Sequence, residues 1–212
     1  GSELDGTATD YGGVPPTAGV ILGPERNKAA EVGTKWELFD RHLLVTGALF
    51  HTEKDNARET VNRNGVNTLE SGAAYQVEGI DLEVSGKITD RWSVFGGLVL
   101  MRSKVLQSGN PANIGLQMAN IAHESFSMLS KYKFDGGWEL GGQAVYRSKI
   151  YGGTFGANTG TELPSYWRFD AFVEKKIDKN WTMKLYAQNL TNKLYYDTLY
   201  RSATPFVAVA PG

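Results

Sequence analysis

Three histidines are the side chains of this sequence best suited to acid–base or metal chemistry. They are His42, His51 and His123, and they share no metal-ligand spacing. The sequence has no cysteine, so it offers neither thiolate ligands nor disulfides. His123 could act as a general base, but no serine pairs with it by motif and no clustered carboxylate pair stands out. We therefore expect no metal site, no cofactor and no enzyme activity.

The charge balance and the glycine pairs bear on other classes of function. A net charge of −1 argues against binding nucleic acid by phosphate neutralisation. Gly96-Gly97 and Gly141-Gly142 have no helical pattern after them, so neither forms a phosphate-binding loop. Close packing of a barrel wall, or of a plug against that wall, explains these glycines better. No apolar run approaches the ~18–20 residues of a transmembrane helix.

Four short polar turns recur along the chain, and each lies next to a tryptophan. The turns are Phe39-Asp40-Arg41, Thr89-Asp90-Arg91, Asp135-Gly136-Gly137 and Asp178-Lys179-Asn180. The tryptophans are Trp36, Trp92, Trp138 and Trp181. Between successive turns lie two segments of alternating polarity and one long loop. Short turns at one end, long loops at the other and indole rings at one level are typical of a transmembrane β-barrel wall.

The segments between the turns alternate in polarity with period two, a pattern that a helix cannot use. Residues 181–188 place apolar side chains at odd positions and mostly polar ones at even positions. The preceding segment puts Phe169 on one face, with Arg168 and Asp170 on the other. Residues 42–52 are ambiguous because both faces carry apolar side chains. We count eight strands, most about ten residues or longer, which suits a tilted membrane crossing of ~9–11 residues.

The connections differ in length between the two ends of the predicted strands. The long ones are residues 55–72, 105–122, 151–164 and 191–212, and Asn64-Gly65 predicts a tight turn inside the first. In outer-membrane barrels the short turns face the periplasm and the long loops face outside. We therefore expect the four turn-side tryptophans to form the periplasmic aromatic girdle. We expect Tyr146, Tyr151, Tyr166 and Trp167 near the outer girdle.

The apolar face of each strand is compatible with two architectures. In a soluble eight-stranded barrel such as a lipocalin, that face points inward around a ligand. In a membrane barrel it points out to lipid. The turn-side tryptophans favour lipid because indoles prefer the membrane interface, and charged residues such as Arg168 and Lys184 suit a wet or plugged lumen. The sequence thus predicts an all-β fold: an antiparallel transmembrane β-barrel segment of about eight long strands in a bacterial outer membrane.

Five stretches resemble the C-terminal part of the barrel in TonB-dependent outer-membrane siderophore receptors. They are residues 31–36 (EVGTKW), 49–58 (LFHTEKDNAR), 77–86 (VEGIDLEVSG), 163–167 (LPSYW) and 186–196 (YAQNLTNKLYY). The five stretches occur in the same order as in that family, and the resemblance rests on this shared order. The details are most similar to catecholate-type receptors.

The resemblance implies a larger 22-stranded barrel whose lumen holds an N-terminal plug, with this chain as a barrel fragment. We expect residues 1–27 to be an irregular N-terminal segment, residues 28–190 to be barrel strands and residues 191–212 to be an extracellular loop before a missing last strand. The chain has no plug and no TonB box. The implied function is TonB-dependent uptake of a ferric siderophore. The implied partners are that ligand, TonB through the absent plug, outer-membrane lipid and the remainder of the barrel.

Other functions remain open at this point. A stand-alone eight-stranded outer-membrane barrel, with a structural or adhesive role, would pair its first strand with its eighth. A soluble lipocalin-like carrier would bury its tryptophans. A barrel hydrolase would need a serine and a histidine within hydrogen-bond reach.

The resemblance also implies where a ligand would bind, which is on the long loops and the outer ends of the lumen-facing strands. A ferric catecholate complex is anionic and aromatic, so arginine, lysine, tyrosine and phenylalanine suit it. The candidate ligand-binding residues are Arg102, Arg147, Tyr151, Phe155, Tyr200 and Arg201.

Overall fold

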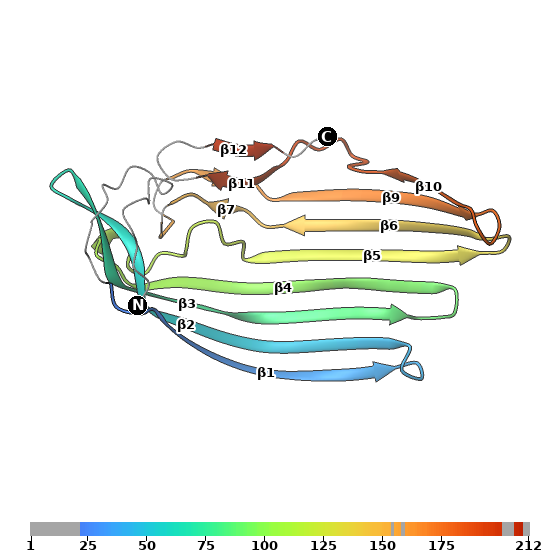
Figure 1. The fold of residues 1–212 in the computed structure, drawn as a ribbon, viewed down its shortest axis with the longest axis horizontal. Coiled ribbons are helices and arrows are strands. Elements are labelled where there is room, and N and C mark those ends of the chain that lie inside the picture. Colours follow the sequence, from blue (N-terminus) through green and yellow to red (C-terminus); the bar gives the residue numbers. More distant parts are fainter. Residues whose placement is uncertain (1–21, 154, 158–159, 201–205, 210–212) are drawn as a thin grey trace.

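The computed structural model describes residues 22–153, 155–157, 160–200 and 206–209, and antiparallel strands dominate it (Figure 1). Eight strands form one sheet, in the order β1-β2-β3-β4-β5-β6-β9-β10. They are β1 Arg26–Leu38, β2 Leu43–Arg63, β3 Val66–Lys87, β4 Trp92–Gln107, β5 Glu124–Phe134, β6 Trp138–Arg147, β9 Tyr166–Lys176 and β10 Thr182–Ala187. The described residues include no helix long and apolar enough to span a membrane. The predicted all-β fold of about eight long strands is confirmed.

The sheet is open, and β1 and β10 are its two edges (Figure 1). Within the described part of the chain, β1 pairs with β2 and β10 pairs with β9, but the two edges do not pair with each other. The stand-alone eight-stranded barrel is therefore wrong for this chain. A lipocalin-like carrier does not fit either, because Trp36 and Trp181 are 52% and 69% exposed. Unpaired edges are not tolerated in lipid, so the sheet requires further strands.

The four short turns lie together at one end of the sheet (Figure 1). Residues 39–41 all have positive φ, between 52° and 68°, and Gly136 and Gly137 also have positive φ. Their backbone therefore reverses within three or four residues. The turn-side tryptophans are all exposed there, as a lipid-interface girdle requires. At the other end, Trp167 packs against Tyr146 and Phe126, with ring centroids 4.8 and 5.9 Å apart.

The first long connection is not a loop. β2 and β3 continue beyond the rest of the sheet as one hairpin, which ends at Asn64-Gly65 with φ of 53° and 86°. The predicted tight turn is confirmed, whereas the predicted loop at 55–72 is wrong. Residues 55–72 are mostly polar, as in a loop, so the sequence pattern did not indicate strands there. A bidentate pair across the tip, from Arg63 to Glu70 at 2.6 and 2.8 Å, holds them together.

The remaining outer connections pack together over the outer end of the sheet. They contain a 3₁₀ turn at Pro111–Asn113 and the short hairpins β7–β8 (Ile150–Tyr151, Glu162–Leu163) and β11–β12 (Tyr196–Tyr200, Phe206–Val209). Residues 117–120 hydrogen-bond through their backbone to residues 151–157, and Met118 forms an isolated bridge with Gly156. A small apolar core lies among these connections: Ala122, Ile150, Leu163 and Leu199. We call this assembly the outer cap.

The pairing register sorts side chains onto two faces. One transverse row consists of Trp36, Val45, Val84, Gly96, Met128, Ala144 and Phe169. Apolar side chains share this side of every strand, which we call the lipid face. The opposite side, the inner face, carries ion pairs such as Lys131–Glu139 and Lys184–Glu174. Residues 42–52 fit this scheme as part of β2.

The inner face also explains Gly141, one member of the pair Gly141-Gly142. Gly141 on β6 lies directly opposite Phe172 on β9, and a Cβ at Gly141 would overlap the Phe172 ring. The ring therefore lies across the glycine, and the Lys184 ammonium stands over it at 3.8 Å. The predicted role of this glycine in close packing is confirmed.

The two faces predict opposite effects for neighbouring substitutions. Leu82 lies on the lipid face midway between Gly86 and Glu78, whereas Asp81 lies on the inner face. Leu82→Arg in the complete protein should cost about 2–4 kcal/mol, because it places a charge near the bilayer midplane. Asp81→Arg should be tolerated. Chemical unfolding in lipid vesicles measures both, and equal losses would contradict the assignment of faces.

Candidate ligand-facing surface

A buried carboxylate organises the inner face near the outer end of β9. Asp170 is 2% exposed, and its oxygens accept hydrogen bonds from the Arg168 guanidinium at 3.1–3.2 Å. The backbone N–H of Asn189 donates to the same carboxylate at 2.9 Å, and the Tyr186 hydroxyl lies 3.5 Å from it. A buried charge is costly unless it is fully paired. These donors satisfy Asp170 and hold the chain after β10 against β9.

A second arginine holds the same stretch of chain. Arg147 on β6 donates to the carbonyl oxygens of Tyr196 and Asp197, the former at 2.6 Å. Its guanidinium lies over the Tyr166 ring, 5.0 Å from the centroid. Tyr166 in turn stacks on Tyr195, with centroids 4.5 Å apart. Residues 189–197 are thus held by two arginines and stacked tyrosine rings.

The outer cap presents further aromatic and cationic groups. The Phe155 ring meets Tyr75 of β3 edge-on, with centroids 5.5 Å apart. The Lys149 ammonium lies 5.0 Å from the Tyr151 ring centroid, and a hydrogen bond with Tyr151, together with Glu162, raises the pKa of Lys149. Lys149 therefore stays charged at neutral pH. Such pairs present π faces and fixed cations, which are suited to an anionic aromatic ligand.

The outer cap is joined to the β2–β3 hairpin by another buried carboxylate. Glu59 is 7% exposed and accepts hydrogen bonds from the Ser108 hydroxyl, at 2.7 Å, and from the Gly109 backbone. The Ser108 hydroxyl also accepts from the backbone N–H of Asn110. These bonds link the hairpin to the loop that follows β4.

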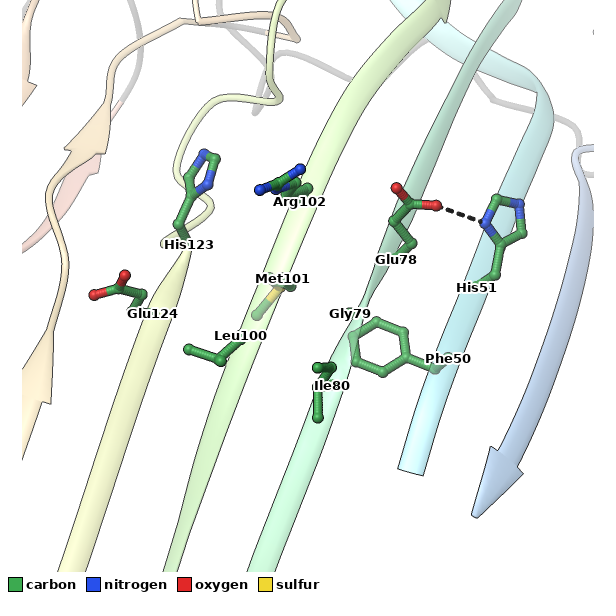
Figure 2. Close-up of a pocket in the computed structure, with 10 residues that line it drawn as sticks. All are labelled: Phe50, His51, Glu78, Gly79, Ile80, Leu100, Met101, Arg102, His123 and Glu124. Carbon is green, nitrogen blue, oxygen red and sulfur yellow. Dashed lines mark hydrogen bonds and ion pairs between the residues drawn. The ribbon is translucent and has the colours of Figure 1, made fainter. Parts of the chain in front are cut away.

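A hollow of about 590 Å³ crosses β2 to β5 at their outer ends (Figure 2). His51, Glu78, Arg102 and His123 are among its lining residues, and His123 bonds Gln117 at 2.6 Å. The histidines do not meet: His42 bonds Phe39 at the opposite end of β2. Within the described ranges, no three His, Asp or Glu side chains are grouped closely enough to hold a metal ion.

The six residues that the sequence suggested as ligand contacts do not form one cluster. Arg147 lies on the inner face, but its nitrogens bind the backbone of residues 196–197. Tyr151 and Phe155 lie in the outer cap. Arg102 has the parity of Leu100 and therefore stands on the lipid face, away from the lumen. Tyr200 ends β11 without a described side chain, and Arg201 lies outside the described residues.

Sequence reasoning missed the central role of Asp170. The alternation placed Asp170 and Arg168 on a polar face, but their partners Asn189 and Tyr195 lie 19 and 27 residues away. The usable signal was the run 186–196, rich in tyrosine and asparagine, which comes one strand after the Arg168-x-Asp170 pair on β9.

Two acidic residues on the inner face of β9 give a matched test of this network. Asp170→Ala removes the carboxylate partner of Arg168, leaving it only the Tyr195 hydroxyl, and should cost about 3–5 kcal/mol, as expected for a broken buried pair. Glu174→Ala removes a half-exposed pair with Lys184 and should cost at most about 1 kcal/mol. Hydrogen exchange at the Asn189 amide in the complete protein should accelerate only for Asp170→Ala. Unchanged exchange would refute the network.

The chain is similar in sequence to known outer-membrane receptors. A family model described as TonB dependent receptor-like, beta-barrel, matches residues 2–190. The probable TonB-dependent receptor BfrD of Bordetella pertussis is 37% identical over 90% of this chain and 26% of that protein. The probable TonB-dependent siderophore receptor PiuA of Acinetobacter baumannii is 32% identical over 86% of this chain and 25% of its own length.

Solved structures agree with the sequence relatives. The crystal structure of PiuA superposes with a TM-score of 0.80 at 30% identity, covering 91% of this chain and 28% of that one. The ferric-catecholate import receptor Fiu of Escherichia coli K12, in its closed form, superposes with a TM-score of 0.76 at 25% identity over 89% and 26%. The chain spans about a quarter of the length of the curated relatives it matches. With its open eight-stranded sheet, it belongs to the family of TonB-dependent receptor β-barrels of the bacterial outer membrane.

Proposed function

We propose that this chain is part of the barrel wall of a receptor that takes up a ferric siderophore across the outer membrane, driven by TonB. The observation that carries the proposal is the open sheet, which has a lipid face, a charged inner face and an outer cap bearing aromatic and cationic side chains. TonB would act through a plug domain inside the completed barrel. Residues 191–212 would form an extracellular loop and residues 28–190 the strands before it. The first 27 residues would be an irregular segment except for Arg26 and Asn27, which belong to β1.

The ligand class that suits the outer cap is an anionic, aromatic iron complex of the catecholate type. Phe155 with Tyr75, and Tyr151 with Lys149, offer ring faces and a fixed cation in the cap. Arg147 contributes less directly, since its guanidinium already binds backbone carbonyls. Tyr200 and Arg201 remain candidates in the same loop. Iron here is cargo inside the ligand, so the wall itself needs no metal ligands.

Uptake requires the complete barrel. This chain alone should bind the iron(III) complex of 2,3-dihydroxybenzoate weakly at best and should not transport it, because both edges of its sheet are unpaired. Growth of a receptor-deficient strain on that iron source measures transport. Rescue by this segment alone would contradict the proposal, and the complete receptor serves as the positive control.

The cap aromatics give the sharpest test of the ligand class. Phe155→Ala in the complete receptor should weaken binding of iron(III) 2,3-dihydroxybenzoate by about tenfold, as for a central aromatic contact. Phe39→Ala, in a turn at the opposite end, should leave binding unchanged. Intrinsic fluorescence quenching measures both affinities. If an iron(III) trihydroxamate bound more tightly than the catecholate complex, the catecholate assignment would fail.

A further inference from the structure

The lipid face changes character abruptly at the outer ends of β1 to β4. The register aligns the exposed apolar side chains Val32, Leu49, Ile80 and Leu100 in one transverse row. The next row outward is Ala30, His51, Glu78 and Arg102, and the row after that is Lys28, Glu53, Gln76 and Lys104. The face thus turns from apolar to polar within two residues, about 6–7 Å of strand. This step marks the outer edge of the hydrocarbon layer.

Most acidic groups in these two polar rows already have partners. His51 lies 3.3 Å from Glu78, as Figure 2 shows, and 3.2 Å from Glu53. Lys28 pairs with Asp55 at 3.2 Å just beyond them. Because one imidazole carries at most one positive charge, His51 and its two carboxylates keep at least one negative charge, and Glu78 lies directly across from Arg102 in the register.

In the part of the chain that the structure describes, two cations at the same level have no partner. Arg102 and Lys104 stand two residues apart on β4, both exposed and both on the lipid face. Among the described residues, neither side chain forms a hydrogen bond or an ion pair. Glu124 on β5 is an exposed carboxylate directly across from Leu100, one row nearer the apolar band.

We propose that Arg102 and Lys104 bind the phosphate of an anionic lipid headgroup in the outer leaflet, with its acyl chain against Ile80 and Leu100. A guanidinium engages phosphate oxygens through two parallel hydrogen bonds, and an ammonium adds a compact charge beside it. Ile80 and Leu100 are 38% and 37% exposed directly below, on the side that faces lipid. The site therefore offers cations for the lipid phosphate and an apolar surface for the acyl chain, next to each other at the membrane boundary. It does not depend on which ligand the receptor transports.

The test uses the complete receptor in detergent, titrated with dimyristoyl phosphatidylglycerol and, separately, with dimyristoyl phosphatidylcholine. Native mass spectrometry counts the bound lipid. The double variant Arg102→Gln with Lys104→Gln should bind phosphatidylglycerol about 25-fold more weakly, since each basic residue at an anionic membrane surface contributes about fivefold. Phosphatidylcholine binding should stay the same. The Glu124→Gln variant should bind phosphatidylglycerol more tightly, because it removes a repelling charge.

A matched control separates a local site from a general charge effect. Lys131→Gln with Lys133→Gln removes the same charge from the inner face of β5 and should leave phosphatidylglycerol binding unchanged. An equal loss in both double variants would overturn the proposal, as would no loss in the first. Binding of inorganic phosphate as tightly as phosphatidylglycerol would also overturn it, because the acyl chain would then contribute nothing.

Discussion

Backbone pairing across the eight strands is the constraint on which the rest of this structure depends. The hydrocarbon core supplies no water, so every strand N–H and C=O must find a partner in a neighbouring strand. That pairing fixes one register from Arg26 to Ala187, and the register fixes which side chains meet lipid. A slip of one residue would send Phe169 inward and Arg168 out. The exposed edges at β1 and β10 are where the remaining strands of the receptor must pair.

Outside the membrane, hydrogen bonds between charged side chains and the backbone hold the connections in place. The outer connections have only short ladders, and a few charged side chains bind backbone groups that these ladders leave over. Glu59 accepts from Gly109, Asp170 accepts from Asn189, and Arg147 donates to residues 196–197. Each of these charged groups is largely buried, and a buried charge is destabilising unless it is paired. The hydrogen bond thus stabilises the charged side chain as well as the loop backbone. The cap is therefore coupled to the strands beneath it.

The sequence predicts what is local and misses what is not. Period-two alternation found β6 and β9, and Asn64-Gly65 found the hairpin turn, because both signals lie within a few residues. The outer half of the β2–β3 hairpin was missed, since its polar residues match a loop and the cross-strand contacts that stabilise its tip, such as Arg63–Glu70 and Asn62–Asn67, are not visible in the sequence. The partners of Asp170 are equally remote in sequence. The face of Arg102, by contrast, was within reach: it has the parity of Leu98 and Leu100.

The outer end of β4 contacts the outer cap on one face and the lipid boundary on the other. Ser103 points to the inner face, where its hydroxyl accepts a hydrogen bond from the Met118 backbone at 3.0 Å and anchors the cap. Arg102 and Lys104 point to the lipid boundary on either side of it. This division persists until the register shift between Ala74 and Tyr75, opposite the end of β4. Beyond that shift β2 and β3 leave the sheet as a hairpin. A bulge interrupts the strict alternation of side chains between the two faces. The separation into a lipid face and an inner face therefore stops at this shift, where β4 ends.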